Sequence, residues 1–349
     1  GGASYGGMSD GGAPVLADGA PAILAFDWTT GLVRFDERGR RVVVAAPTEG
    51  PVLAHAYQPV LVDEASGRWA ITRQAKGAAK RAWAVMIGDA GGATGEFAGD
   101  PTCGGSGPAC FEVLTAFTPD RGGVLALALH AAGFTLARYD LATGAREQIA
   151  GKAIANRLAL AATHDRAAYV SRGGLTLVDW TARGPRPKAR TRRVKVSGEL
   201  DRLVLLDDAV LVRRRVVGRG RRVAITVEVI DPASGDREVV YRPRHELPWA
   251  PVEAPARGSA FVHDCDFTRG DNPCDVVEAT SVGARVMVRG VARALDVSAD
   301  GRYLLVRRDP RARAGRATAW PDLVVIELST GREVRVVTET PIDSAQFTR

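Results

Sequence analysis

Short apolar runs separated by polar turns recur along the chain, and the clearest set lies between residues 292 and 338. Leu295 and Val297 flank a polar position there, and three further apolar runs follow at residues 303–306, 323–328 and 334–337. Two turn sequences interrupt them, Ser-Ala-Asp-Gly at 298–301 and Ser-Thr-Gly at 329–331. Alternation and short apolar runs between such turns are typical of antiparallel strands. The pattern therefore predicts a four-stranded antiparallel unit.

The corner before the fourth strand of this unit has two earlier copies. The three sequences are Asp-Leu-Ala-Thr-Gly at 140–144, Asp-Pro-Ala-Ser-Gly at 231–235 and Glu-Leu-Ser-Thr-Gly at 327–331. Their final glycines are 91 and 96 residues apart, so that each interval holds two units of the usual blade length. Because one four-stranded unit cannot bury both of its faces, we expect copies to stack beside one another.

Candidates for the remaining units fill the intervals. The expected blades span residues 23–45, 60–97, 111–149, 158–196, 203–241, 251–288 and 292–338. The first has only three strands, and an unused strand, Ile342–Phe347, remains at the other end of the chain. Pairing that strand into the first blade closes the ring and removes its open edges. The sequence predicts an all-β, seven-bladed propeller of four-stranded antiparallel blades as a single domain over residues 20–349.

Two segments resemble the TolB-type repeat of bacterial seven-bladed propellers. One is Val297-Ser-Ala-Asp-Gly-Arg-Tyr-Leu-Leu-Val306, followed by Asp322-Leu-Val-Val-Ile-Glu-Leu-Ser-Thr-Gly331. The other is Phe117-Thr-Pro-Asp120 with Leu136-Ala-Arg-Tyr-Asp-Leu-Ala-Thr-Gly144. A Gly-His…Trp-Asp signature, typical of WD repeats, is absent. The resemblance implies the fold and a bias toward proteins of the bacterial cell envelope, but no particular activity.

The composition fits one globular domain and no membrane span. The chain has 349 residues, of which 46% are hydrophobic. No apolar run approaches the ~20 residues of a membrane helix, so we expect no transmembrane segment. Residues 1–19 are rich in glycine and are predicted to form a flexible linker. Either they follow a processed export signal, with a lipid-bearing cysteine upstream of Gly1, or they are a cloning remnant or a disordered terminus.

Four cysteines fall in two close pairs, Cys103 with Cys110 and Cys265 with Cys274. Both pairs bracket segments rich in Gly, Pro, Asp or Asn, and none of the four lies in an expected strand. This arrangement favours two disulfides and an oxidising compartment, hence the periplasm, the outer membrane or the extracellular space. Zinc binding and free thiols are the alternatives, although the spacings are wider than in common zinc sites and no histidine pair lies nearby.

The net charge of +7 is concentrated in links between second and third strands. The basic residues of these links are Arg73, Lys76, Lys80, Arg81, Arg213, Arg214, Arg215, Arg219, Arg221, Arg222, Arg307, Arg308, Arg311, Arg313 and Arg316. In a propeller these links share one face, which would suit an acidic polysaccharide, a lipid headgroup or an acidic partner protein. A solvated rim that keeps the protein soluble is the alternative. Nucleic acid is disfavoured because no aromatic residues are interleaved with the arginines.

Familiar catalytic and metal-binding motifs are absent from the sequence. The five histidines are scattered, and no phosphate-cradling Gly-Lys-Ser or His-Glu-X-X-His motif occurs. The two Gly-X-Ser-X-Gly matches, at residues 2–6 and 7–11, lie in the glycine-rich N-terminal segment and not in the strand-to-helix turn of a nucleophile elbow. Asp264, Asp266, Asp271 and Asp275 crowd the second cysteine pair and form a weak calcium candidate, because they lack the ordered spacing of an EF-hand loop. We expect no cofactor.

Three functional hypotheses follow. The first is a non-catalytic exported propeller that acts as a binding or scaffold module of the cell envelope or surface. The second is a hydrolase or lyase with its site in the central channel, acting on an anionic glycan. The third is a subunit of a larger extracellular assembly, tethered by the glycine-rich N-terminal segment.

Overall fold

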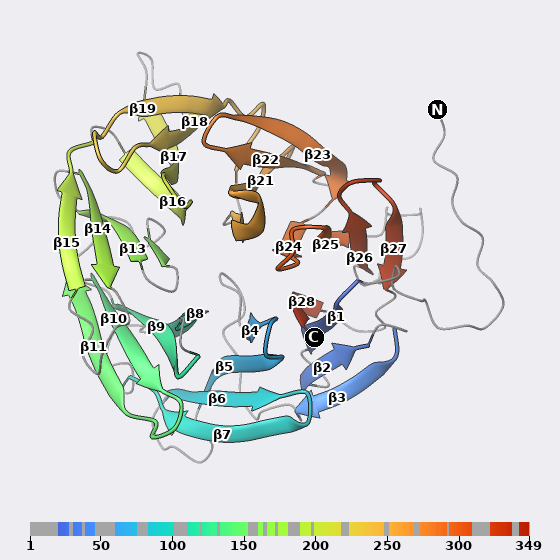
Figure 1. Cartoon of the computed structure of the whole chain (residues 1–349). Coiled ribbons are helices and arrows are strands. Elements are labelled where there is room, and N and C mark those ends of the chain that lie inside the picture. Colours follow the sequence, from blue (N-terminus) through green and yellow to red (C-terminus); the bar gives the residue numbers. More distant parts are fainter. Residues whose placement is uncertain are drawn as a thin grey trace.

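Apolar runs and turn residues set the strands much as the sequence predicts. The described residues form seven sheets of four antiparallel strands, arranged as blades around a central axis (Figure 1). The predicted seven-bladed, all-β architecture is therefore confirmed. The computed structural model describes residues 20–27, 31–36, 39–45, 60–74, 83–100, 111–118, 121–130, 133–152, 160–162, 166–171, 174–180, 189–196, 199–217, 223–247, 251–268, 273–291, 293–308, 322–336 and 342–348.

The first four blades each run from an innermost strand near the central axis to an outermost strand at the rim. The first contains, in that order, β28 (Ile342–Thr348), β1 (Ala22–Asp27), β2 (Gly31–Phe35) and β3 (Arg41–Ala45). The second contains β4 (Val60–Asp63), β5 (Arg68–Gln74), β6 (Trp83–Asp89) and β7 (Gly92–Ala98). The third contains β8 (Phe111–Phe117), β9 (Gly123–His130), β10 (Gly133–Asp140) and β11 (Arg146–Lys152). The fourth contains β12 (Leu160–Ala162), β13 (Arg166–Ser171), β14 (Gly174–Trp180) and β15 (Ala189–Val194).

The last three blades complete the ring in the same order. The fifth contains β16 (Glu199–Leu205), β17 (Val210–Val217), β18 (Val223–Ile230) and β19 (Arg237–Tyr241). The sixth contains β20 (Val252–Ala254), β21 (Ser259–Cys265), β22 (Cys274–Thr280) and β23 (Gly283–Val291), with a 3₁₀ turn, η3 (Pro255–Arg257), before β21. The seventh contains β24 (Arg293–Val297), β25 (Tyr303–Arg308), β26 (Asp322–Glu327) and β27 (Glu333–Val336).

The C-terminal strand closes the ring as predicted. β28 pairs antiparallel with β1, and Phe347 lies opposite Ile23 in that pairing. Both side chains are fully buried in one cluster with Tyr303 and Leu305 of the seventh blade. Backbone pairing and apolar packing therefore hold the first and seventh blades together.

The corners between third and fourth strands follow the repeated sequence signal. Gly144, Gly235 and Gly331 have φ angles of 70°, 82° and 72°, values that glycine adopts without strain. The amide of each donates to the carbonyl oxygen of the residue four positions earlier, at 2.8 Å in all three corners. The shared Gly-ending sequence thus encodes one local turn.

Antiparallel order within the blades places all links between second and third strands on one face, which we call the link face. The segments that connect successive blades reach the same face, whereas the glycine corners lie on the opposite one. Several second strands extend farther toward the link face than the apolar pattern indicated: β5 ends at Gln74, β17 at Val217 and β25 at Arg308. Arg73, Arg213–Arg215 and Arg307–Arg308 therefore lie in strand ends rather than in loops.

The N-terminal residues 1–19 lie outside the described part of the chain. Their role as a linker, and the division of the chain into linker and domain, therefore stay predictions. Among the described residues, no helix is long and apolar enough to cross a membrane.

Candidate functional site

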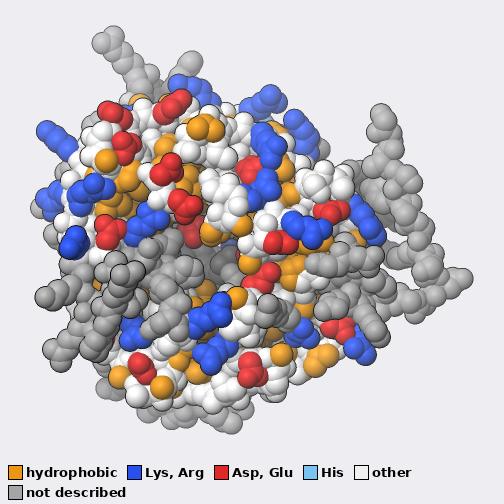
Figure 2. Space-filling view, viewed as in Figure 1, with side chains coloured by type: hydrophobic (Ala, Val, Ile, Leu, Met, Phe, Trp, Pro, Cys, Tyr) orange, Lys and Arg blue, Asp and Glu red, His pale blue; other side chains and the backbone are white. Residues whose placement is uncertain are grey.

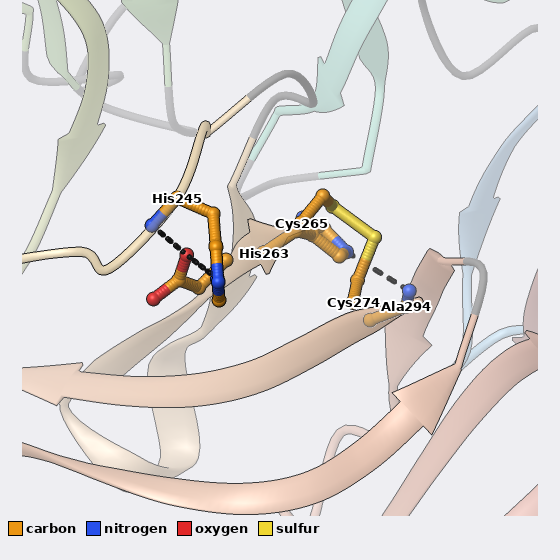
Figure 3. Close-up of a disulfide and its surroundings, with 6 residues drawn as sticks. His245, His263, Cys265, Cys274 and Ala294 are labelled. Carbon is orange, nitrogen blue, oxygen red and sulfur yellow. Dashed lines mark hydrogen bonds and ion pairs between the residues drawn. A yellow bond between two sulfur atoms is a disulfide. The ribbon is translucent and has the colours of Figure 1, made fainter. Parts of the chain in front are cut away.

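Strand β21 directs alternate side chains to different neighbouring blades near the link face (Figure 3). His263 faces the seventh blade, where its Nε2 accepts a hydrogen bond from the amide of Ala294 at 2.9 Å. Asp264 faces the fifth blade, where it accepts a hydrogen bond from the hydroxyl of Tyr241 at 2.6 Å. Strand geometry turns successive side chains to opposite faces of a sheet, so this one strand joins both neighbours.

The buried carboxylate of Asp264 fixes the segment that leads from the fifth blade to the sixth. Besides the Tyr241 hydroxyl, it accepts hydrogen bonds from the backbone amides of Arg244 and His245, both at 2.8 Å. Nδ1 of His245 lies 3.3 Å from the same carboxylate. Burial, together with the Asp264 hydrogen bond and charge, raises the pKa of Tyr241, so this phenol stays protonated and continues to donate.

Residues 242–245 are thereby held in one backbone conformation with their side chains outside. Glu246 forms an antiparallel bridge with Cys265, with its carbonyl oxygen accepting from the Cys265 amide at 2.8 Å. Arg242, Arg244 and His245 are exposed. No carboxylate among the described residues forms an ion pair with Arg242 or Arg244. We call residues 242–245 the pinned basic segment.

A disulfide lies directly beneath this segment. Cys265 and Cys274 lie opposite one another in the β21–β22 pairing and are bonded, with an S–S distance of 2.03 Å. Both are buried, and they stand at strand ends rather than in the loop that the sequence indicated (Figure 3). One of the two predicted disulfides is therefore present, and the zinc and free-thiol alternatives do not apply to this pair. Cys103 and Cys110 lie outside the described residues.

His263 has a structural position. Its ring is buried, and burial together with the nearby charge of Arg293 lowers the pKa of His263 to about 3. The ring is therefore neutral at ordinary pH and can accept the Ala294 amide through Nε2. The contact joins the sixth and seventh blades and leaves no basic nitrogen for solvent.

The arginines predicted on the link face are partly engaged within the protein. Those of β17 contact the carbonyl oxygen of Leu247 (Arg213) and the carboxylates of Glu228 (Arg214, 3.2 Å) and Glu199 (Arg215, 3.9 Å). In β25, Arg308 pairs with Glu333 and Arg307 is partly buried. The other predicted contact residues lie outside the described side chains: Arg73, Lys76, Lys80, Arg81, Arg219, Arg221, Arg222, Arg311, Arg313 and Arg316. Their role in binding stays a prediction.

The described aspartates of the calcium candidate accept hydrogen bonds from donors within the protein. Asp264 accepts the hydrogen bonds described above, Asp266 accepts from the amide and hydroxyl of Thr268, and Asp275 accepts from Arg289 at 3.0 Å. Asp271 lies outside the described residues. Within the described part of the chain, no group of three or more His, Cys, Asp or Glu side chains converges as a metal site requires.

Two carboxyl groups on innermost strands, those of Glu253 and Asp296, have raised pKa values. Burial raises the pKa of Glu253 on β20 to about 7. Burial, helped by the charge of Glu64, also raises the pKa of Asp296 on β24 to about 7, although Asp296 accepts from the Phe347 amide at 2.8 Å. On the face in Figure 2, both acidic and basic side chains lie around the central hollow, and further lysines and arginines are spread over the surrounding blades.

The pinned basic segment was not predicted from the sequence. Its residues, Arg-Pro-Arg-His, follow an expected outer strand, and the two arginines are visible in the sequence as a pair of cations. The predicted basic face comprised only links within blades, whereas this segment joins two blades. The partner that fixes it, Asp264, lies 23 residues from Tyr241 along the chain, and no local pattern reveals that contact.

Comparisons with known proteins show the fold. No protein-family model and no curated protein matches the sequence. Among solved structures, TolB from Acinetobacter baumannii is similar with a TM-score of 0.50 and 13% identity, over 82% of this chain and 67% of that one. A putative 6-phosphogluconolactonase from Bacteroides fragilis is similar with a TM-score of 0.53 and 10% identity, over 95% and 99%. The chain thus has a TolB-like seven-bladed propeller fold.

Proposed function

We propose that this protein is a non-catalytic, exported binding module that holds an anionic partner, foremost an acidic protein, on its link face. One observation carries the proposal: Asp264 fixes the backbone of the pinned basic segment while Arg242, Arg244 and His245 remain exposed. Guanidinium groups on a fixed backbone lose less entropy when they bind a carboxylate than those on a loose loop. The segment therefore suits recognition of carboxylate or phosphate groups.

The buried disulfide supports export. Cys265–Cys274 persists where the surroundings are oxidising, as in the periplasm, at the outer membrane or outside the cell. The TolB-like fold is consistent with a protein of the cell envelope, although 13% identity carries no activity across. A lipid anchor upstream of Gly1 remains part of the same proposal.

The binding test uses poly-L-glutamate as the probe and isothermal titration calorimetry as the measurement. The double variant Arg242→Glu/Arg244→Glu is compared with Arg332→Glu, a single reversal of an exposed arginine at a glycine corner on the opposite face. We expect the double variant to bind about tenfold more weakly, which corresponds to about 1.4 kcal/mol. The control should bind like the unmodified protein. The control reverses one charge and the double variant two, so a loss of binding free energy in the control of half the size or more would reduce the effect to net charge and contradict the proposal.

The alternative of a channel-sited hydrolase or lyase acting on an anionic glycan is favoured by one observation. Glu253 and Asp296 lie on innermost strands, and a pKa of about 7 suits a general acid or base. The test is incubation with polygalacturonate and measurement of new reducing ends. Release that disappears in both Glu253→Gln and Asp296→Asn would establish this function in place of the binding module.

A further inference from the structure

Strands β17 and β18 form an arm that reaches farther toward the link face than β19, the outermost strand of the fifth blade. The two strands remain paired up to Val217 opposite Val223. On the outer side, β19 pairs with β18 only as far as Val227 opposite Tyr241. The outer edge of β18 over residues 223–226 therefore has no partner strand among the described residues.

The arm carries exposed apolar side chains. Val217 is 63% exposed and Val223 is 47% exposed, and they lie directly opposite one another. An unpaired strand edge presents a row of backbone N–H and C=O groups that can template another strand. Apolar side chains beside such an edge add packing area for an incoming strand. The arm thus offers both backbone and side-chain contacts.

The pinned basic segment begins where this edge opens. Tyr241 is the last residue of β19 to pair with β18, and Arg242 and Arg244 follow it at once. Both arginines are exposed, and Asp264 fixes the backbone on which they stand. A strand that continued the sheet along residues 223–226 would therefore end beside two cations of fixed position.

We propose that an extended, acidic segment of a partner protein adds as a further strand along residues 223–226 of β18 and directs carboxylates to Arg242 and Arg244. This inference rests on the proposed function and names the chemistry of its partner. An anionic lipid surface fits less well, because an unpaired strand edge would enter hydrocarbon without hydrogen-bond partners. A second copy paired edge to edge also fits less well, because the strand that it would present, Val-Ala-Ile-Thr at 223–226, carries no carboxylate for Arg242 and Arg244.

The probe is a fluorescein-labelled, capped peptide of sequence Asp-Asp-Val-Thr-Val-Thr-Asp-Asp, with a control in which lysine replaces every aspartate. Fluorescence anisotropy gives its affinity, and hydrogen exchange reports the amides of β18. We expect the acidic peptide to bind about tenfold more tightly than the lysine peptide, and about tenfold more weakly to Arg242→Glu/Arg244→Glu. Exchange within residues 223–226 should slow on binding, and Arg332→Glu should behave like the unmodified protein.

Each other outcome overturns the inference in a distinguishable way. Peptide binding without protection of residues 223–226 would leave the anionic site standing and remove strand addition. Equal binding of acidic and lysine peptides would remove the role of the arginines. Absence of peptide binding, combined with capture on phosphatidylglycerol vesicles, would assign the arm to a lipid surface. Loss of poly-L-glutamate binding as well would show that the proposed function itself has failed.

Discussion

His263 in the sixth blade accepts a hydrogen bond from the backbone amide of Ala294 in the seventh, at 2.9 Å. Two further blade boundaries are joined in the same manner. Asp296 accepts from the amide of Phe347 at 2.8 Å, and the side chain of Gln346 accepts from the amide of Val62 at 2.9 Å. In each case a side chain of one blade satisfies an amide of the next blade's innermost strand. Unpaired buried amides are costly, so these contacts help to fix the order of blades around the ring.

Because His263 is buried and neutral, we expect the free energy of unfolding to decrease as the pH falls. The pKa of His263 is about 3 in the folded protein and near 6.5 when the ring is exposed. Its contribution is therefore complete above pH 6.5 and is lost as the pH falls toward 3, because protonation favours the unfolded chain. We expect His263→Gln, which keeps an acceptor for Ala294, to lose less stability between pH 6 and 4 than the unmodified protein, by about 1 kcal/mol or more. Urea unfolding at several pH values measures the free energy of unfolding of both proteins. The same pH dependence in both would contradict the prediction.

Asp296 should make the free energy of unfolding depend on pH in the opposite direction. Its pKa is raised from 3.8 to about 7, so its contribution is complete below pH 3.8 and is lost as the pH rises through 7. Asp296→Asn keeps an acceptor for the Phe347 amide and carries no charge. We expect it to be more stable than the unmodified protein by about 1–2 kcal/mol at pH 8, with the gain vanishing near pH 4.

A matched variant controls this comparison. Asp208→Asn changes an exposed aspartate in the turn between β16 and β17. It should leave the unfolding free energy unchanged at both pH values. A gain in Asp296→Asn that is equal at pH 4 and pH 8 would show that repacking, and not ionisation, is responsible.

Alanine substitutions at two glycine corners distinguish the cost of backbone strain from the cost of steric crowding. At Gly331 an added Cβ meets no atom within 4 Å, whereas at Gly144 it would lie 2.5 Å from a ring carbon of Phe97. Both have positive φ, so Gly331→Ala should cost about 1 kcal/mol from strain alone. Gly144→Ala should cost clearly more, because the ring must also move. Unfolding of both variants by guanidinium measures the loss in unfolding free energy. Equal losses would mean that the Phe97 ring moves away from the added Cβ at no cost in free energy.

The disulfide can be tested by the mass change on reduction and by the loss of stability when its cysteines are replaced. Intact mass under thiol-blocking conditions should rise on reduction by one pair of hydrogens for Cys265–Cys274, and by two pairs if Cys103 and Cys110 are also bonded. Replacing Cys265 and Cys274 together by alanine should cost roughly 3 kcal/mol for a loop of this size. Immediate blocking of all four thiols in the native protein would remove the argument for export.

The sequence predicted the blades because an apolar strand between turn residues leaves a local signal. Ring closure was readable for the same reason, since Ile342–Phe347 is an apolar strand without a blade of its own. An exposed strand has no apolar pattern to mark its ends: the fourth blade was expected to end at residue 196, but its outermost strand, β15, spans Ala189–Val194, where Arg192 and Arg193 are exposed. The ends of β17 and β25 were missed because arginines continue those strands.

The candidate site was less predictable because it depends on contacts between blades. Asp264 was grouped with its neighbours in sequence as a calcium candidate, and its actual partners come from the fifth blade. The sequence does show which residues are cationic. It does not show which backbone a buried carboxylate holds, since that requires the packing of two sheets.

Asp264 itself gives the sharpest test of the site. In Asp264→Asn the remaining oxygen can no longer satisfy the Tyr241 hydroxyl and the amides of Arg244 and His245 together, so we expect a loss of about 3 kcal/mol. Hydrogen exchange should accelerate at those two amides and remain slow in β1. The pKa of Tyr241 should fall toward its ordinary value, which ultraviolet titration follows.

Asp275→Asn is the matched control, because Asp275 lies opposite Asp264 in the β21–β22 pairing and bonds Arg289 instead. It should leave exchange at Arg244 and His245 unchanged. If Asp264→Asn is folded and binds poly-L-glutamate as tightly as the unmodified protein, a fixed backbone is unnecessary for binding. The link between the buried carboxylate and the exposed arginines would then be refuted, because loose arginines would serve equally well.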